Sequence, residues 1–450
     1  MLPTHETNRC PERQPVDRDP SNRVMPASAT ADESGSRRLA QQRPLKYTLC
    51  VTLRCNLTCS YCYVGKSGAT MSLAMAAKIL DFIFWNASPG RAIEIGFFGG
   101  EPLLEFPLIE AISDLIASHP GRQRREVGLT LTTNGTLFST AIADYLKASG
   151  VKFCVSCDGP PHVQNMFRRT LEGRDTAAVV EDNLRLARLS LPAVLVNAVY
   201  GPKTFRHLPE TVDYFSGLGL RQIYLNPDFS APWTETEAKA LPEIYRAIGE
   251  RYISWYLAGD PHFVSLIDSK IAVLLRGGYH PAERCQMGRG EMAFTPDGGI
   301  YPCERLIGSG VGEANRIGHV DRGLDLSRLS WRLATCGQAN PECVDCSLRV
   351  CCMNWCGCSN AFMTGYYNRV GPFLCASERA AVQTAFEVFT VLGKRLGPVF
   401  LHHLAGAPQL NSRLPQGSGM GKPTAASVNS AVADFETPQA DKQTTMRGPP

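Results

Sequence analysis

The sequence predicts an α/β protein in which a partial, TIM-like (β/α)6 region is followed by a cysteine-rich domain. Strand-like and helix-like patterns alternate between Leu45 and Asn226, which indicates a parallel sheet with right-handed crossovers. The strand segments are apolar and β-branched, as expected when both faces of a sheet are covered. Cysteines then gather between Cys285 and Cys375. Six β/α units are too few to close an eightfold barrel.

The alternating region is read from patterns of period two and period 3.6. The expected strands are Lys46–Leu53, Ala92–Phe98, Val127–Thr133, Val151–Ser156, Ala193–Tyr200 and Gln222–Leu225. The expected helices are Leu73–Asn86, Leu104–Ser118, Ala141–Ala148, Ala177–Leu189 and Phe205–Gly217. Polar and glycine-rich motifs stand directly after the first four strands. Sites in parallel α/β proteins are built at that edge of the sheet.

Later segments carry weaker periodic signals. Two amphipathic stretches, Glu237–Leu257 and Val264–Leu275, are expected to pack on the open side of the barrel. Met292–Phe294 and Ile300–Tyr301 flank a Pro-Asp-Gly-Gly turn, which predicts a β-hairpin. An amphipathic helix is expected from Ser377 to about Leu404.

These elements divide the chain into six segments. They are a polar tail at 1–43, the barrel at 44–227, a helical bridge at 228–284, the cysteine-rich domain at 285–376, a helix at 377–404 and a second polar tail at 405–450. Both tails are too poor in apolar side chains to offset the entropy of ordering, so we expect them to be disordered.

Composition excludes several functions. The net charge is +4 with no basic stripe, so nucleic acid is not an expected partner. No apolar run approaches the ~20 residues that span a bilayer, and the N-terminus has no signal-peptide core. We therefore expect a cytoplasmic protein without a membrane partner. In a reducing compartment, metal ligation explains 17 cysteines better than disulfides do.

The most informative stretch is the loop after the first strand. Cys55, Cys59 and Cys62 are spaced C-x3-C-x2-C, and Tyr61 precedes the third thiol. Three thiolates on one loop can hold three corners of an iron–sulfur cube and leave the fourth iron open. A zinc site usually has four protein ligands and two C-x2-C pairs. Three buried structural cysteines are the remaining alternative.

This motif resembles the radical S-adenosylmethionine (radical SAM) enzymes. The segments Gly99-Gly100-Glu101-Pro102, Thr132–Gly135 and Ser156–Pro160 match that superfamily's pattern in kind and order. The resemblance extends from Leu45 to about Asn226 and implies a partial barrel that is open along one side.

The resemblance also suggests residues that bind the cofactor. Glu101 would accept the methionine ammonium group, and Gly99 and Gly100 would let the backbone approach the ligand closely. Ser156 and Asn134 are candidates for the carboxylate or ribose, and either could instead simply cap a turn. The remaining expected cofactor-binding residues are Tyr61, Pro102, Asp158 and Arg168, of which Arg168 has a surface arginine as its alternative.

The later cysteines resemble the SPASM domain, which holds auxiliary iron–sulfur clusters. Their pattern is C-x12-G-x4-C followed by C-x2-C-x5-C-x3-C and a final cysteine. The resemblance assigns Cys285, Cys303 and Cys356 to a first cluster. It assigns Cys343, Cys346, Cys352 and Cys375 to a second, giving three [4Fe–4S] clusters in all. A zinc-ribbon-like domain is the alternative.

The first auxiliary cluster lacks a fourth ligand in this assignment. Sulfatase maturases have a further cysteine six residues after the first, and Glu291 stands at that position. Cys336 is one candidate to close the site. The other possibility, which we favour, is an open iron that takes a thiolate from the substrate. Cys351 and Cys358 lie next to or near assigned ligands. An assignment of the ligands that is shifted by one position is therefore an alternative.

The resemblance implies that a 5′-deoxyadenosyl radical abstracts hydrogen from an unactivated carbon. We expect a maturase that cross-links a ribosomally made peptide through a thioether, carbon–carbon or cyclophane bond. Its partners would be the precursor peptide or protein and an electron donor such as flavodoxin or ferredoxin. The alternative is an anaerobic sulfatase maturase that forms formylglycine from Cys or Ser. A non-catalytic electron-transfer protein is a third possibility, against which the Gly-Gly-Glu-Pro motif argues.

One residue is a candidate catalytic base. Glu304 follows Cys303 directly, at the position where sulfatase maturases have an aspartate thought to act as base. The side chain keeps the carboxylate but is one methylene longer. The alternative is a surface salt bridge with Arg305 or another basic residue.

Overall fold

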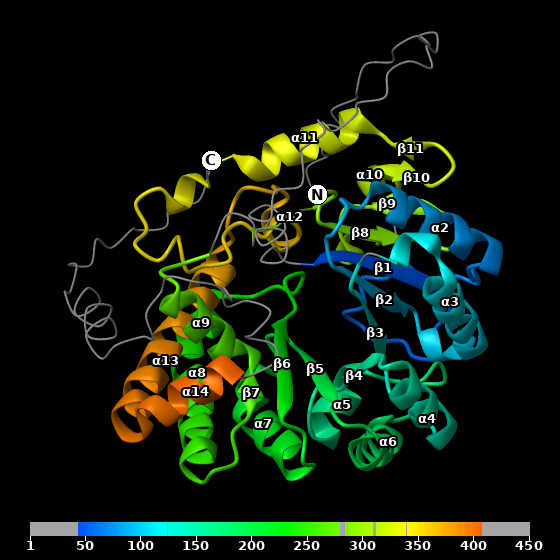
Figure 1. Cartoon of the computed structure of the whole chain (residues 1–450). Helices are drawn as coiled ribbons and strands as arrows, with labels where there is room; N and C mark the ends of the chain where they lie inside the picture. The colour runs from blue at the N-terminus through cyan, green and yellow to red at the C-terminus, as the bar shows by residue number, and fades with distance from the viewer. Residues whose placement is uncertain are drawn as a thin grey trace.

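The computed structural model describes residues 44–123, 125–279, 284–285, 287–308, 312–338 and 340–406. Within them a single sheet of 11 strands runs in the order β11-β10-β9-β8-β1-β2-β3-β4-β5-β6-β7. The expected tails 1–43 and 405–450 lie outside the described residues, apart from residues 405 and 406. The strands curve into an open barrel with helices along its outer face (Figure 1).

Six neighbouring parallel strands form the barrel. They are β1 (Leu45–Thr52), β2 (Ile93–Gly99), β3 (Val127–Thr133), β4 (Lys152–Ser156), β5 (Leu195–Tyr200) and β6 (Gln222–Pro227). All six were expected. The sheet ends at β7 (Phe263–Val264) on one side and at β11 on the other, so it is a partial barrel.

Helices cover the outer face of the barrel. They are α2 (Leu73–Asn86), α3 (Phe106–Ser118), α4 (Thr140–Ser149), α5 (Pro161–Phe167), α6 (Ala177–Ser190) and α7 (Leu208–Gly217). Alternation along β1 separates the two faces: Tyr47 and Leu49 join the helix-facing core, whereas Lys46 and Thr48 face the interior of the barrel.

Two expected helices begin later than the pattern indicated. The helix expected from Leu104 starts at Phe106, after the 3₁₀ turn η1 (Pro102–Glu105), and the one expected from Phe205 starts at Leu208, after η3 (Phe205–His207). Each helix has a proline in its first two positions, where the missing N–H is not needed. A further 3₁₀ turn, η2 (Pro120–Arg122), follows α3.

The cysteine-rich region extends the barrel sheet. The expected hairpin forms as β8 (Glu291–Phe294) and β9 (Gly299–Tyr301). Strand β8 also pairs in parallel with β1, which places Lys46 opposite Glu291. The remaining elements of this region are β10 (Gly318–His319), β11 (Gly323–Leu324), α10 (Gly312–Asn315), α11 (Leu326–Gly337), α12 (Gly357–Thr364), η5 (Glu304–Leu306) and η6 (Pro341–Cys343).

Helices from the bridge and the C-terminus pack together beside β6 and β7 (Figure 1). They are α8 (Glu235–Leu257), α9 (Ser265–Leu275), α13 (Pro372–Leu396) and α14 (Pro398–Gly406). The single helix expected over Ser377–Leu404 is wrong in two respects. It begins at Pro372, and it breaks at Gly397, which has a φ of +51° and precedes Pro398.

A buried ion pair joins two of these helices. Lys270 Nζ of α9 lies 2.6 Å from Glu378 Oε2 of α13, and the side chains are only 4% and 9% exposed. Lys270→Ala leaves the Glu378 carboxylate buried without its cation. We expect this change to reduce the free energy of unfolding by ~3–5 kcal/mol in anaerobic denaturant titrations.

Arg246→Ala is a matched control for that experiment. It removes the exposed pair that Arg246 of α8 makes with Glu387 of α13, at 3.5 Å. An exposed pair contributes ~1 kcal/mol or less. Equal losses from both substitutions would contradict a special role for the buried pair.

Candidate active site

The three thiols of the C-x3-C-x2-C motif lie on one loop at the carboxyl end of β1. The Cys62 amide donates to the Cys59 carbonyl at 3.2 Å, and the Leu57 amide lies 3.4 Å from the Cys55 sulfur. The motif had not drawn attention to Lys66, whose Nζ donates to the Leu57 carbonyl at 2.5 Å. Burial raises the pKa of Cys55 and Cys59, and the Lys66 ammonium opposes this rise. A nearby cation favours the thiolate that binds metal.

The glycine pair at the end of β2 is required by close packing against this loop. Gly99 has a φ of +139°, and a Cβ there would lie 2.1 Å from the Thr52 carbonyl oxygen. A Cβ at Gly100 would lie 2.0 Å from the Arg54 carbonyl oxygen. The Gly100 amide donates to Thr52 at 2.9 Å. The backbone that approaches these glycines is the end of β1, at Thr52, and the start of the cysteine loop, at Arg54.

Glu101 anchors the ends of two strands. Its buried carboxylate accepts hydrogen bonds from the Leu103 amide at 2.9 Å, Thr133 Oγ1 at 2.6 Å and the Asn134 amide at 2.7 Å. The Asn134 side chain in turn donates to Asn56 of the cysteine loop at 2.8 Å. The expected ammonium-binding carboxylate therefore already holds the loop, β2 and β3 together.

Asp158, Tyr61 and Arg168 form a compact group beside Cys59. Asp158 Oδ2 accepts from the Tyr61 hydroxyl at 2.5 Å and lies 3.0 Å from Arg168 Nε. Burial would lower the pKa of Arg168, but the Asp158 carboxylate outweighs it, so the pKa is raised. The surface alternative for Arg168 is wrong, because the chain after α5 turns inward and leaves the residue 6% exposed.

Two further expected residues occupy the same edge of the sheet. Ser156 ends β4 and lies in register with Asn197 of β5. Pro102 is buried at the start of η1, directly after Glu101. The expected cofactor-binding residues that contact the cysteine loop or one another, through the contacts given above, are Gly99, Gly100, Glu101, Asn134, Tyr61, Asp158 and Arg168.

Glu304 points into the barrel from η5. Its Oε2 accepts from Thr48 Oγ1 at 2.9 Å and from Lys46 Nζ at 3.2 Å, both on β1. Burial alone would raise the pKa of Glu304, but Lys46, Thr48 and Arg305 together outweigh it and hold the pKa below its usual range. Of the alternatives considered from the sequence, the salt bridge forms with another basic residue, Lys46, rather than with Arg305, and the pair is partly buried on the interior face of the barrel rather than on the surface.

Glu291 belongs to the same row of charged side chains as Glu304 and Lys46. Lys46 Nζ lies 3.9 Å from Glu291 Oε1, which is 3.5 Å from the Cys303 sulfur. Lys46 therefore stands between two carboxylates, one on β8 and one on η5. This chain of charges connects the barrel interior to a thiol of the cysteine-rich region.

The thiols expected to bind the first auxiliary cluster are Cys285, Cys303 and Cys356, and we call them the first auxiliary group. The structure places further thiols beside them. The Cys358 sulfur lies 3.9 Å from that of Cys303 and 3.7 Å from that of Cys356. Cys285 and Cys336 pack against the same cluster of buried residues. Sequence spacing had left Cys358 unassigned, and its contact with Cys303 across 55 positions explains why.

The second auxiliary group contains the four expected thiols. Burial, followed by the neighbouring thiols of Cys346 and Cys375, raises the pKa of Cys343 to about 11. The pKa of the Cys352 thiol is likewise raised, mainly by burial and to a smaller extent by the nearby Cys343 thiol. Arg379, one helical turn after Cys375 on α13, approaches the Cys346 sulfur to 3.8 Å. This arginine was not identified from the sequence.

The distances between the thiols bear on the choice between a zinc ion and an iron–sulfur cluster. A single tetrahedral zinc ion with Zn–S bonds of ~2.3 Å needs sulfurs ~3.8 Å apart. Among the described residues, the one group of three possible ligand atoms found within 4.8 Å of one another contains no cysteine. The pairs Cys303–Cys358 and Cys356–Cys358, at 3.9 and 3.7 Å, have the spacing of zinc ligands, whereas each thiolate of a cubane binds a different iron and lies farther from the next.

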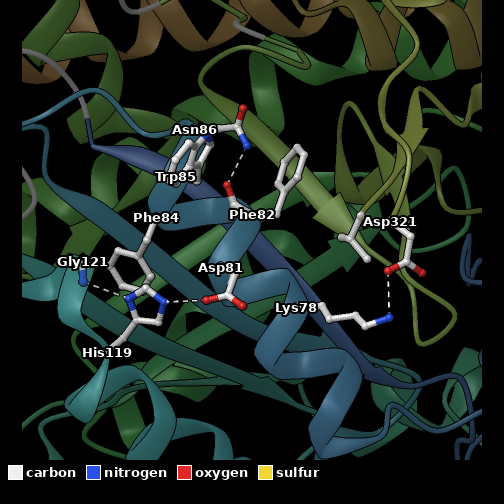
Figure 2. A pocket seen from close by; sticks show the side chains of 10 residues that line it. Lys78, Asp81, Phe82, Phe84, Trp85, Asn86, His119, Gly121 and Asp321 are labelled. Atoms are coloured by element: carbon white, nitrogen blue, oxygen red, sulfur yellow. Dashed lines mark hydrogen bonds and ion pairs between the residues drawn. The ribbon is translucent and has the colours of Figure 1, made fainter. Parts of the chain in front are cut away.

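Two pockets lined by described residues differ in their relation to these groups. One, of about 340 Å³, adjoins the cysteine loop at Leu53 and Lys66. The other, of about 560 Å³, lies on the outer face of the barrel. Figure 2 shows its lining of α2 side chains, including Trp85, together with the His119–Asp81 and Lys78–Asp321 pairs. None of its lining residues belongs to the cysteine groups.

Comparison with known proteins identifies the barrel. Residues 49–215 match the model of the radical SAM superfamily. These residues form a radical SAM domain. The chain thus contains a radical SAM domain, as the cysteine loop and its neighbouring motifs indicated.

Two relatives illustrate the range of similarity. An uncharacterised protein of Methanocaldococcus jannaschii is 27% identical over 275 residues, which are 59% of this chain and 88% of that protein. The cysteine-type anaerobic sulfatase-maturating enzyme of Clostridium perfringens is 23% identical over 273 residues, which are 56% of this chain and 72% of that enzyme.

Solved structures show the same fold. The structure of anSMEcpe with bound AdoMet has a TM-score of 0.67 at 19% identity, and the match covers 80% of this chain and 99% of that chain. The structure of SuiB of Streptococcus suis, bound to S-adenosylmethionine, has a TM-score of 0.51 at 16% identity. The match covers 74% of this chain and 77% of that chain. The expected α/β fold is confirmed. No helix in the described part of the chain is long and apolar enough to cross a membrane.

Proposed function

We propose that this radical SAM enzyme is a maturase that cross-links a ribosomally synthesised peptide. The observation that carries the proposal is the placement of Glu304. This carboxylate faces the barrel interior, directly follows a thiol of the first auxiliary group, and acts electrostatically on Tyr63, the residue after Cys62. A proton acceptor, an auxiliary group and the cysteine loop therefore adjoin one interior space.

The residues around the cysteine loop fit the radical SAM cofactors. When bound, S-adenosylmethionine and a [4Fe–4S] cluster would supply a 5′-deoxyadenosyl radical that removes a hydrogen atom from the substrate. Cys55, Cys59 and Cys62 would hold the cluster. Asp158 and Arg168 neutralise each other beside Cys59, and Glu101 keeps the loop against β2 and β3.

Two auxiliary [4Fe–4S] clusters complete the proposal. Cys343, Cys346, Cys352 and Cys375 would bind one of them. Cys285, Cys303 and Cys356 would bind the other, with Cys358 as the fourth ligand. We prefer Cys358 to an open iron, because its sulfur lies within 4 Å of two of the other thiols. A donor protein of the flavodoxin or ferredoxin type would supply the electron that cofactor cleavage consumes, and the auxiliary clusters would give the substrate's electron a route to an acceptor.

The choice of ligand has a direct test. Cys358→Ala is expected to change the electron paramagnetic resonance of one auxiliary cluster and to lower its iron content, because the group at Cys303 then keeps three thiolates and one open iron. Cys336→Ala is the matched control and should keep the parent iron content. The measurement is iron per chain together with electron paramagnetic resonance of the reduced protein. Loss of a cluster only in Cys336→Ala would contradict the assignment.

A sulfatase maturase is the second candidate function. The similarity to the Clostridium perfringens enzyme supports it, as does the carboxylate that follows Cys303. The pairing of Glu304 with Lys46 is compatible with either reaction. The two functions differ in what the substrate loses, so mass spectrometry separates them.

The deciding experiment uses reconstituted enzyme with two kinds of substrate. One is the Cp18Cys peptide, which has been seen with anSMEcpe, and the other is each short peptide encoded beside the gene. Cross-linking removes a pair of hydrogens and retains every sulfur. Formylglycine formation replaces the cysteine thiol with an aldehyde. We expect the first change on a neighbouring peptide and no change to Cp18Cys; an aldehyde on Cp18Cys would establish the second function instead.

A further inference from the structure

A group of side chains outside the cysteine sites has the composition of a metal site. His162 lies on α5, and His207 and Glu210 lie at the start of α7. Both segments stand at the carboxyl edge of the sheet, after β4 and β5, and the two helices are neighbours in Figure 1. All three side chains are between a third and just over half exposed, so an ion could reach them from solvent.

The three ligand atoms form a nearly equilateral triangle. His162 Nε2 lies 3.4 Å from His207 Nδ1 and 3.5 Å from Glu210 Oε2, and His207 Nδ1 lies 3.4 Å from Glu210 Oε2. Tetrahedral zinc with ligand bonds of ~2.0–2.1 Å places its ligand atoms ~3.3–3.4 Å apart. The triangle therefore has the dimensions of one face of a zinc coordination tetrahedron.

From this geometry we propose that His162, His207 and Glu210 bind a divalent ion of the zinc type. Two imidazoles and a carboxylate are ligands that zinc accepts, and a site with three protein ligands keeps its fourth position for water. The ion joins two successive β/α units at the rim of the barrel. It is separate from the iron–sulfur ligands and does not depend on which peptide the enzyme modifies.

A ligand-replacement series tests the site in the holoenzyme. The parent, His162→Ala, His207→Ala and the control His119→Ala are treated with chelator under anaerobic conditions and dialysed against buffered free zinc. His119 is a suitable control because it faces a single carboxylate, Asp81, at 3.1 Å. We expect about one zinc per chain more in the parent and the control than in the two other variants, with equal iron in all four.

The ligand atoms themselves can be identified by X-ray absorption at the zinc edge. A shell of nitrogen and oxygen at ~2.0–2.1 Å without sulfur is the expected result for the parent. A sulfur shell would show that zinc had entered a cysteine group. That result, or equal zinc in the parent and His162→Ala, would overturn the proposal.

Discussion

Simultaneous replacement of Cys55, Cys59 and Cys62 by alanine is expected to abolish formation of 5′-deoxyadenosine. The three thiols share one loop, and the described chain offers no other thiol on it to take their place. Iron should fall by about one cluster's content, while the auxiliary clusters remain. The measurements are liquid chromatography of the nucleoside and iron per chain, both after anaerobic reconstitution.

Cys50→Ala is a matched control for the triple variant. Cys50 is a fully buried thiol on β1, where it packs with Ala293, Tyr301 and Ile307 rather than within a cysteine group. We expect it to keep the parent iron content and cleavage rate. Cofactor cleavage at the parent rate by the triple variant would contradict the assignment of the loop.

Glu304→Gln is expected to slow formation of modified peptide by ~10²-fold or more, because the amide has the same shape but cannot accept a proton. Cleavage of the cofactor without coupled product should continue near the parent rate. The hydrogen bond from Thr48 Oγ1 can be kept by the amide oxygen, so the fold around β1 should persist. Product and 5′-deoxyadenosine are measured in the same reaction.

Glu291→Gln separates the role of Glu304 from a general effect of charge. Glu291 also lies near Lys46, at 3.9 Å, but it is not hydrogen-bonded to Thr48. This variant should retain product formation better than Glu304→Gln does. Product at the parent rate in Glu304→Gln would show that Glu304 only anchors Lys46.

Local patterns in the sequence predicted the barrel well. Val127–Thr133 and Leu73–Asn86 have the expected bounds, because each has a clear period and clear flanking residues. Ser72 caps the helix through the Met75 amide, as serine at a helix start commonly does. The other strand boundaries differ by up to two residues, where pairing with neighbours decides the end.

Contacts between distant residues could not be predicted in the same way. Glu304 meets Lys46 across 258 positions, and the partner of Cys303 is 55 positions away. Spacing rules cover ligands on one loop, so they identified Cys55, Cys59 and Cys62 but left Cys358 unassigned. The surface alternative for Arg168 is wrong because the burial of this residue depends on the turn that follows α5.

The pairing of β8 with β1 has a consequence for biosynthesis. As the chain leaves the ribosome, β1 is among the first strands made, yet the neighbour on one of its edges, Glu291–Phe294, is translated after the whole barrel. Until then that edge presents unpaired backbone groups, which favour aggregation. Pairings so distant in sequence also form slowly. Chaperones that hold nascent chains would therefore benefit this enzyme most during synthesis of residues 228–294.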